Sequence, residues 1–366
     1  MRSFAFINAS KLTEGTFVSS FKLFRELSSA GFPINWYQCV DVGRKENYLT
    51  NEHTIKGSSF PGGVLSMGFN RLLLFPRGIR RIRDDFIVFS DPTLLGFMKP
   101  TSRMIVILHD IRPLTEYKDR LSTHLLYRYI LPRLKQVGLI IVPTQHLQQM
   151  LLARGFEADQ IAVIPLTTDV SFKPSDHINN SVENLRAKSE LRILYVSSDR
   201  PYKNVSFFIK LAERMQNEKG PISFRFILVC KLRRKTEQEI ASRELNNLHL
   251  LGNVENIWKA YSDADVLAFP SMFEGFGLPI IEAMSLGMPV IVNDLSPMRD
   301  LVGKREMSLP PNDLNAWSMT LRRLSGVEEY VSEANIALNR ARMFSEKEYS
   351  LRVRQTFDGF AHKTVS

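Results

Sequence analysis

The chain has 366 residues and a mass of 42.0 kDa. This length suits two domains, because single hydrophobic cores seldom extend beyond about 250–300 residues. Apolar residues make up 44% and charged residues 23%, which argues against disorder, and two distant cysteines exclude a disulfide framework. No run approaches the roughly 18 apolar residues of a membrane span, and the opening apolar run is too short for a signal peptide. The net charge of +10 predicts an anionic partner: a nucleotide, an acidic lipid surface or a nucleic acid.

Short β-rich runs alternate with helical patterns along the whole chain, which predicts parallel sheets in a doubly wound α/β architecture. In the first half we expect strands at 3–8, 34–40, 86–90, 104–108, 139–143 and 161–164. Helices are expected at 17–30, 119–136 and 145–154. These elements predict a first domain over residues 1–170.

The segment Arg71–Arg83 carries five arginines among leucines, isoleucines and a phenylalanine. Basic residues interleaved with apolar ones are typical of segments that contact anionic lipid. The alternative is a core-facing helix with a solvated basic face, broken at Pro76. A nucleic-acid site would need aromatic stacking platforms, and only Phe69 and Phe75 lie near, so nucleic acid is not predicted as a partner.

A polar passage rich in helix breakers follows Pro165 and shows no periodicity, so residues 171–190 are predicted to be a linker. The alternation then resumes over a second domain, predicted at 191–345. Its strands are expected at 191–196, 223–229, 249–251, 266–269 and 289–292, and its helices at 203–216 and 256–264. Two such domains predict a ligand cleft near the carboxyl ends of their strands.

Two carboxylates, Glu274 and Glu282, lie eight positions apart on either side of a Gly-Phe-Gly-Leu-Pro turn. An apolar strand, 266–269, precedes them, and the stretch 278–286 is predicted to be a helix with Pro279 in its first turn. Glycines let a ligand approach the backbone, and a helix start offers unpaired N–H groups to an anion. Carboxylates accept hydrogen bonds from hydroxyls, so the segment fits a nucleotide sugar.

This Glu-x7-Glu pattern resembles the signature of retaining glycosyltransferases with the GT-B fold, in particular glycosyltransferase family 4, the glycosyl transferases group 1. The resemblance extends, in the family's order, to Leu108–Pro113, Ile141–Gln145, Val163–Pro165 and Pro201–Asn204. It covers roughly residues 100–305, and the first hundred residues match in layout only. It implies two Rossmann-like domains facing across a cleft, with a final helix within 346–366 that returns to the first domain.

The resemblance also implies a role for each donor-site residue. Glu282 would hold the ribose and Glu274 the sugar hydroxyls. The diphosphate and the sugar would contact backbone N–H groups of Gly275, Phe276, Gly277 and Leu278. The base would lie against the backbone of the loop that contains Val254.

Cations and a histidine complete the predicted site. Lys203, with Arg200 as its partner, would stabilise the leaving diphosphate, although a solvated lysine at a helix start is the alternative. His109 follows a strand, and the resemblance implies that it hydrogen bonds at the reaction centre; a purely structural histidine is the alternative. The family carries a glycine pair after the first strand, whereas this chain has a lone Gly15, with Glu14, Thr16 and Ser19 as unranked phosphate contacts.

We therefore expect a metal-independent, retaining hexosyltransferase that uses a nucleoside-diphosphate sugar and no cofactor. Its acceptor would be a glycan, a lipid-linked sugar or another hydroxyl, in cell-surface polysaccharide or glycoconjugate synthesis. We expect it in the cytoplasm, peripheral to the inner face of the membrane through Arg71–Arg83. The alternatives are a GT-B epimerase or phosphorylase, and a basic binding module without activity. The sequence leaves the donor base, the acceptor and the oligomeric state open.

Overall fold

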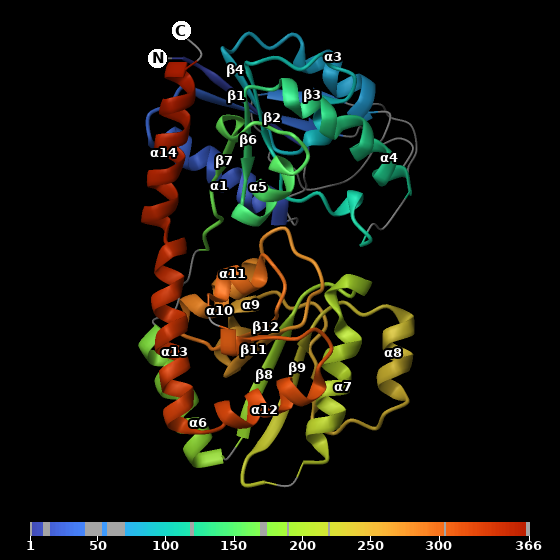
Figure 1. Cartoon of the computed structure of the whole chain (residues 1–366), viewed down its shortest axis with the longest axis vertical. Helices are drawn as coiled ribbons and strands as arrows, with labels where there is room; N and C mark the ends of the chain where they lie inside the picture. The colour runs from blue at the N-terminus through green and yellow to red at the C-terminus, as the bar shows by residue number, and fades with distance from the viewer. Residues whose placement is uncertain are drawn as a thin grey trace. The chain divides into compact units, whose positions relative to one another are not determined.

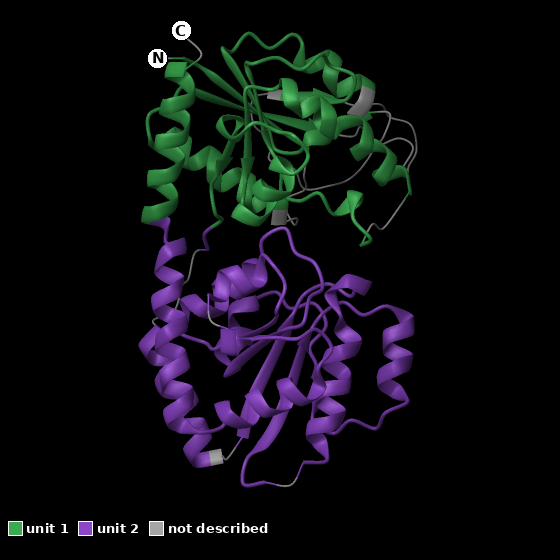
Figure 2. Ribbon diagram, in the orientation of Figure 1, with its two compact units in different colours: residues 1–166, 347–366 green, residues 167–346 purple. Residues whose placement is uncertain are grey.

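The structure is a computed structural model that describes residues 2–9, 15–40, 53–56, 70–117, 121–168, 174–188, 190–218, 220–303 and 305–363. The chain divides into two compact units (Figure 2). Unit 1 comprises Met1–Leu166 and Lys347–Ser366, and unit 2 comprises Thr167–Glu346. Within the described residues, no helix combines the length and the hydropathy needed to cross a membrane.

Unit 1 is built on a seven-stranded sheet in the order β3-β2-β1-β4-β5-β6-β7. Every neighbouring pair of strands is parallel, as the alternation of elements predicts. The strands are β1 (Phe4–Asn8), β2 (Ile34–Val40), β3 (His53–Lys56), β4 (Phe86–Phe89), β5 (Met104–Ile107), β6 (Leu139–Val142) and β7 (Ile161–Val163).

Helices cover both faces of this sheet (Figure 1). Successive strand residues alternate between the faces, so that Phe4 and Phe6 enter one core cluster while Ala5 and Ile7 enter the other. One face packs on α1 (Gly15–Ser29) and α14 (Glu346–Lys363). The other packs on α3 (Phe75–Ile79), α4 (Leu121–Ile130) and α5 (Gln145–Leu152).

The final helix, α14, belongs to unit 1 although most of the chain separates it from β1. Its buried residues recur at helical spacing and are Tyr349, Val353, Phe357 and Phe360. The Phe357 ring lies 5.6 Å from the ring of Phe4, centroid to centroid. This contact joins the first strand to the last helix within one core.

Unit 2 is built on a six-stranded, all-parallel sheet in the order β10-β9-β8-β11-β12-β13. Its strands are β8 (Glu190–Val196), β9 (Ser223–Val229), β10 (Leu248–Leu250), β11 (Val266–Phe269), β12 (Val290–Asn293) and β13 (Ser308–Leu309). Its helices are α6 (Pro174–Lys188), α7 (Val205–Gln216), α8 (Arg234–Ala241), α9 (Ile257–Ser262), α10 (Leu278–Ser285), α11 (Met298–Val302), α12 (Leu314–Leu324) and α13 (Val327–Ala341). The predicted fold class, two parallel-sheet α/β domains, is confirmed.

The predicted linker is wrong, because most of residues 171–190 form α6 of unit 2. The buried face of α6 comprises His177, Ser181, Asn184 and Leu185, which recur at helical spacing. His177 Nε2 lies 3.0 Å from the backbone oxygen of Ala264. A hydrophobic periodicity is absent because three of these four buried side chains are polar.

The basic segment folds as a π-helical stretch, Asn70–Leu74, followed by α3. Pro76 lies in the first turn of α3 and does not break it. Phe75 and Ile79 are buried in the core of unit 1, whereas Arg77, Arg80, Arg81 and Arg83 are exposed. Phe75 and Ile79 are therefore part of the core of unit 1 and are not available for insertion into lipid. The prediction that the apolar side chains of this segment enter a membrane is wrong for these two residues.

Candidate active site

The strand order of each unit reverses once, between β1 and β4 in unit 1 and between β8 and β11 in unit 2. At such a switch point the loops leave neighbouring strands in opposite directions and open a crevice at the carboxyl ends. In unit 2 the loop after β8 carries Lys203, and the loop after β11 carries Glu274. The fold therefore places two of the predicted catalytic residues on the two loops that leave this switch point.

Lys203 and Glu274 form an ion pair there. Nζ of Lys203 lies 2.6 Å from Oε1 of Glu274, and the two side chains are only 15% and 9% exposed. The ammonium group also lies 5.4 Å from the ring centroid of Tyr202 and 5.8 Å from that of Phe269. A lysine that is held this way is not the freely solvated lysine of the alternative interpretation.

The local backbone differs from the prediction that Lys203 opens a helix. Lys203 ends a 3₁₀ turn, Pro201–Lys203, and Asn204 follows in the left-handed region at φ 60° before α7 begins. Asn tolerates this conformation better than most residues. From the end of this turn the Lys203 side chain reaches the loop after β11, which carries its partner Glu274.

Hydrogen bonds from neighbouring elements hold the Glu274 loop in place. Met272 N donates to the Tyr202 carbonyl at 2.7 Å, which ties the two loops together. Asn293, fully buried at the end of β12, donates from Nδ2 to the carbonyls of Pro270 at 2.7 Å and Ser271 at 3.1 Å. Sequence reasoning missed Asn293; its signal was an amide that directly follows three apolar residues of a strand.

The glycine loop between Glu274 and α10 matches its predicted geometry. Gly277 has φ 110°, and a Cβ there would lie 3.0 Å from Cδ1 of Ile280, so a larger residue would be strained. No side chain caps the start of α10. Phe276 is 5% exposed, with its ring 6.1 Å from that of Phe344, so the backbone is what this residue can offer a ligand.

Glu282 lies just over one turn inside α10. Its Oε2 accepts a hydrogen bond of 2.6 Å from the hydroxyl of Tyr261, which is fully buried on α9. Burial raises the pKa of Glu282, and the bond from Tyr261 partly opposes that rise. Sequence reasoning also missed Tyr261, although Glu282 needs a donor because a buried carboxylate without one is costly.

The loop that is predicted to contact the nucleotide base contains Val254 and leads into α9, the helix that carries Tyr261. Val254 is partly exposed between β10 and α9, and Asn256 caps α9 by accepting from the backbone N of Trp258 at 3.1 Å. Because α9 carries Tyr261, this helix connects the Val254 loop to Glu282. Arg200 is exposed at the start of the 3₁₀ turn, with Nη1 3.3 Å from the hydroxyl of Tyr202.

His109 lies in unit 1, after β5, whereas Glu274 and Lys203 lie in unit 2. Burial lowers the pKa of His109, against the opposing effects of Asp91, Asp110 and a hydrogen bond to the backbone of Ser90. Its Nε2 is buried and has no hydrogen-bond partner among the described residues. The imidazole is therefore neutral at pH 7, which suits hydrogen bonding.

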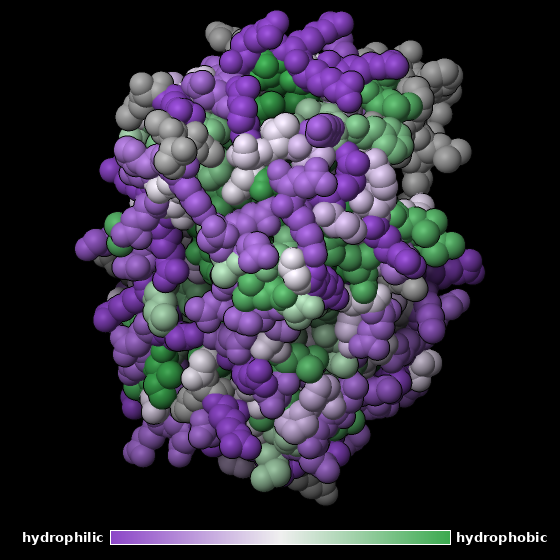
Figure 3. Space-filling model, turned by 45° about the horizontal axis from the view of Figure 1, so that its top comes forward, coloured by the Kyte–Doolittle hydropathy of each residue, from purple (hydrophilic) through white to green (hydrophobic). Residues whose placement is uncertain are grey.

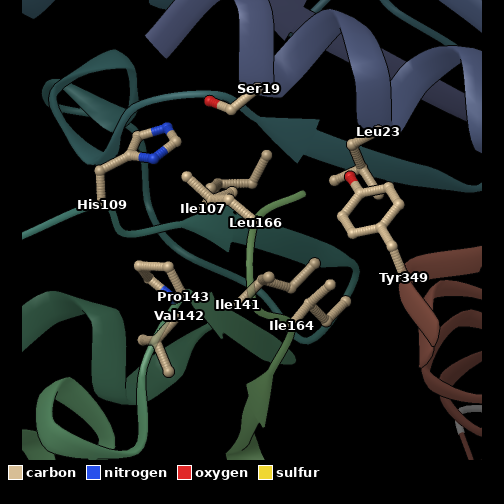
Figure 4. Close-up of a pocket in the computed structure, with 10 residues that line it drawn as sticks. All are labelled: Ser19, Leu23, Ile107, His109, Ile141, Val142, Pro143, Ile164, Leu166 and Tyr349. Carbon is tan, nitrogen blue, oxygen red and sulfur yellow. The ribbon is translucent and has the colours of Figure 1, made fainter. Parts of the chain in front are cut away.

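A small pocket of about 20 Å³ adjoins His109, which is room for about one water molecule (Figure 4). Ser19 of α1 lines it, and Ser19 Oγ donates to the carbonyl of Thr16 at 3.1 Å. Gly15 is the first residue of α1, beside the switch point of unit 1. Glu14, the other candidate phosphate contact, lies outside the described residues. In the part of the chain that is described, no three His, Cys, Asp or Glu side chains cluster as metal ligands.

Two family models match parts of the chain. Residues 176–337 match the family described as glycosyl transferases group 1, and residues 89–166 match the glucosyltransferase 3-like N-terminal domain. The O-antigen chain mannosyltransferase RfbU of Salmonella typhimurium is 24% identical over 237 residues, 63% of each chain. The match thus spans less than two thirds of this curated relative.

Solved structures resemble the whole chain. Sucrose-phosphate synthase from Thermosynechococcus elongatus superposes with a TM-score of 0.77 at 19% identity, over 99% of this chain and 100% of that one. HepE of Anabaena, in complex with UDP and glucose, superposes with a TM-score of 0.75 at 18% identity, over 98% and 100%. Residues 176–337 thus match the group 1 glycosyltransferases, and the chain as a whole has the GT-B fold.

Proposed function

We propose that the protein is a retaining glycosyltransferase that moves a hexose from a nucleoside-diphosphate sugar to a hydroxyl acceptor, in polysaccharide or glycoconjugate synthesis. The observation that carries this proposal is the Lys203–Glu274 ion pair at the switch point of unit 2, beside an uncapped helix start. The relative named as an O-antigen chain mannosyltransferase and the HepE complex with UDP and glucose support it.

In the proposed donor complex, Glu282 accepts hydrogen bonds from the ribose hydroxyls while Tyr261 holds its other side. The backbone N–H groups from Gly275 to Leu278 point at the diphosphate, because helix starts carry unpaired donors and the positive end of the dipole. Glu274 accepts from hydroxyls of the hexose. Val254 and its neighbours contact the base through the backbone.

The reaction breaks the bond between the anomeric carbon and the oxygen of the diphosphate. Negative charge develops on that oxygen, and Lys203 stabilises it at close range, with Arg200 as a second cation. Before the donor binds, Glu274 neutralises the charge of Lys203. The diphosphate of an arriving donor then competes with Glu274 for the Lys203 ammonium group. Glu274 then becomes free to accept from the sugar.

Retention follows if the acceptor hydroxyl attacks the face from which the diphosphate leaves. Its oxygen bonds to the anomeric carbon, and its proton passes to the departing phosphate oxygen. His109 is a hydrogen-bonding group in this scheme, since its lowered pKa keeps the imidazole neutral. A metal ion is not required, because Lys203 and the N–H groups supply the positive charge.

The first test is a thermal-shift panel with UDP, GDP, ADP and their hexose conjugates. A ligand at about 100 times its dissociation constant should stabilise the protein by roughly 2.7 kcal/mol. The pair is then tested with Lys203→Met and Glu274→Gln. We expect transfer to fall at least a hundredfold in Lys203→Met while the protein still binds the nucleoside.

The alternatives predict other results in the same assays. Epimerase or phosphorylase activity would appear as sugar-nucleotide isomerisation or phosphate-dependent cleavage without an acceptor. A binding module would give no turnover. NMR of the product's anomeric proton tests retention, and loss of transfer in EDTA with rescue by manganese would contradict metal independence.

We also propose that the protein contacts an anionic membrane surface from the cytoplasmic side. The net charge of +10 and the exposed Arg77, Arg80, Arg81 and Arg83 favour this contact. Charge alone gives weak, salt-sensitive attachment. Apolar anchors are needed for firm docking, and α3 does not present Phe75 or Ile79 to solvent.

A further inference from the structure

The helix α4 of unit 1 carries apolar side chains on two opposite faces. Leu126, Tyr127 and Ile130 pack against the core of unit 1. On the outer face, Leu121, Leu125 and Tyr129 recur every four residues and are 66%, 56% and 39% exposed. A surface helix of a soluble domain normally shows one apolar stripe, so the outer one calls for a partner.

Phe97 extends this outer stripe beyond the helix. It is 50% exposed, and its ring meets that of Tyr129 edge to face at 5.6 Å. We name Phe97, Leu121, Leu125 and Tyr129 the α4 strip. It holds four of the eleven large hydrophobic side chains that are exposed in the described residues, so these four are clustered. The face of the molecule drawn in Figure 3 is mostly hydrophilic, with hydrophobic groups between hydrophilic ones.

Cations surround the α4 strip. Lys99 and Arg128 are exposed beside it, and the guanidinium carbon of Arg133 lies 4.8 Å above the ring of Tyr129. The 3₁₀ turn Pro92–Leu95 contacts both α4 and the basic segment, so the exposed arginines of that segment belong to the same region. Residues 71–135 contain 13 Lys or Arg and only 6 Asp or Glu.

The acidic residues of this region are partly engaged in local contacts. Asp91 accepts from the backbone N of Thr93 at 2.7 Å, and Asp84 accepts from Asn35 Nδ2 at 3.0 Å. Asp110 accepts from the backbone N of Arg112 at 2.9 Å. The region therefore presents apolar side chains within a field that is mainly positive.

We propose that the α4 strip is the anchor by which the protein docks on an anionic lipid bilayer. The exposed arginines of the basic segment, with Lys99 and Arg128, draw unit 1 to the charged headgroups. Leu121, Leu125 and Phe97 then enter the headgroup boundary, and Tyr129 lies at the level where aromatic rings with polar tips are favoured. This deepens the membrane contact proposed above and assigns its anchors to α4 and Phe97.

A second copy of the chain fits this surface less well. In a two-fold dimer the same patch faces itself, so Lys99 and Arg128 would meet their own symmetry mates around the strip. Like charges brought together in this way oppose association. An anionic bilayer instead offers negative headgroups to the cations and an apolar interior to the strip.

The test is sedimentation of the full chain with vesicles of phosphatidylglycerol and phosphatidylcholine in equal parts, and with phosphatidylcholine alone. The strip variant is Phe97→Ser, Leu121→Ser and Leu125→Ser together. A matched control changes three exposed apolar residues elsewhere: Ile336→Ser, Met319→Ser and Leu351→Ser. We expect wild type and control to pellet with the anionic vesicles only, and the strip variant to partition at least tenfold less.

A second pair of variants tests the charges. Lys99→Ser with Arg128→Ser should weaken binding to anionic vesicles several-fold, whereas Arg234→Ser with Lys235→Ser on α8 should leave it unchanged. Added salt should weaken the wild type. The α4 anchor is overturned if wild type stays in solution at low salt, if strip variant and control pellet alike, or if the strip variant only abolishes a dimer.

Two measurements keep these outcomes interpretable. Circular dichroism melting shows whether each variant is folded, and all the changed side chains are exposed. Nucleotide thermal shifts of the strip variant should equal those of wild type, because its residues lie outside the donor site. Failure of vesicle binding with normal nucleotide binding would therefore refute the docking surface and leave the proposed transferase intact.

Discussion

The two units share an all-parallel sheet but treat buried polar groups differently. In unit 2 each of three buried or half-buried carboxylates has a partner: Asp265 with Arg192, Glu274 with Lys203, and Glu282 with Tyr261. In unit 1 the core between β1, α1 and α14 is a cluster of aromatic rings. Phe6 stacks on Trp36 at 5.2 Å between centroids, and Phe4 packs against Phe86 at 5.1 Å.

This difference indicates that aromatic packing mainly stabilises unit 1, whereas the paired polar groups of unit 2 are arranged to bind a ligand. Aromatic packing stabilises the face of the unit 1 sheet that α1 and α14 cover, without directed charge. The polar groups of unit 2 are fixed by one another before any ligand arrives, as a transition-state site requires. Substitutions should therefore act through lost packing in unit 1 and through unpaired charge or lost affinity in unit 2.

The largest effect is expected in the aromatic core. Phe357→Ala removes a fully buried ring of α14 that contacts Phe4, and should lower the free energy of unfolding of unit 1 by about 3–5 kcal/mol. Urea unfolding followed by circular dichroism measures it. Phe357→Leu is the control and should cost less than half as much. A loss below about 1 kcal/mol for Phe357→Ala would show that α14 does not stabilise this unit.

The matching change in unit 2 is Asp265→Ala. Asp265 is fully buried, and its carboxylate accepts from Arg192 at 2.6 and 2.9 Å. Removing it leaves the guanidinium without its partner, at a cost of about 3 kcal/mol. The control is Lys259→Ala, which breaks an exposed ion pair with Asp263 and should change unfolding by less than about 1 kcal/mol. Equal effects of both variants would contradict the distinction between buried and exposed pairs.

Nucleotide affinity should respond to Glu282 next. Glu282→Ala removes the proposed ribose acceptor, and a lost hydrogen bond to a charged group costs about 1.5–3 kcal/mol, or roughly 10- to 150-fold in dissociation constant. Calorimetric titration with the nucleoside diphosphate found in the panel measures this. Tyr261→Phe keeps the carboxylate and should weaken binding less. Unchanged affinity in a folded Glu282→Ala variant would remove the ribose assignment.

The smallest effect concerns pH, and both units contribute a histidine. Burial lowers the pKa values of His109 in unit 1 and of His177 in unit 2. In the unfolded chain these histidines bind protons near pH 6.5, whereas in the folded chain they bind them only at lower pH. The free energy of unfolding is therefore highest above pH 6.5 and declines as the pH falls below it. Melting temperatures between about pH 7.5 and pH 5 test this. His109→Asn and His177→Asn should each flatten the decline; an unchanged slope in both would contradict the assignment.

The sequence by itself determined eleven of the thirteen strands in the described residues, missing only the short edge strands β3 and β13, and it determined the parallel sheets and the position of the donor loop. Apolar runs such as 266–269 and 139–142 form buried strands because parallel sheets are covered on both faces. Glu274 and Glu282 were recognisable because glycines and a proline mark the turn between them. Each of these signals is local, because it depends only on residues that are neighbours in the sequence.

Only the tertiary structure decided which side chains meet. The α6 helix escaped prediction because its buried face is mostly polar and packs on residues distant in sequence: His177 Nε2 lies 3.0 Å from the Ala264 carbonyl oxygen, and Asn184 Nδ2 donates to Asp265 at 3.4 Å. The pairing of Lys203 with Glu274 spans 71 residues, and that of Tyr261 with Glu282 joins two helices. The basic segment Arg71–Arg83 suggested apolar membrane anchors by its composition, yet α3 buries Phe75, whereas α4 exposes Leu121. Which side chains are buried and which form pairs depends on which helices and strands pack together. That packing depends on contacts between residues far apart in the sequence, which a local sequence pattern does not show.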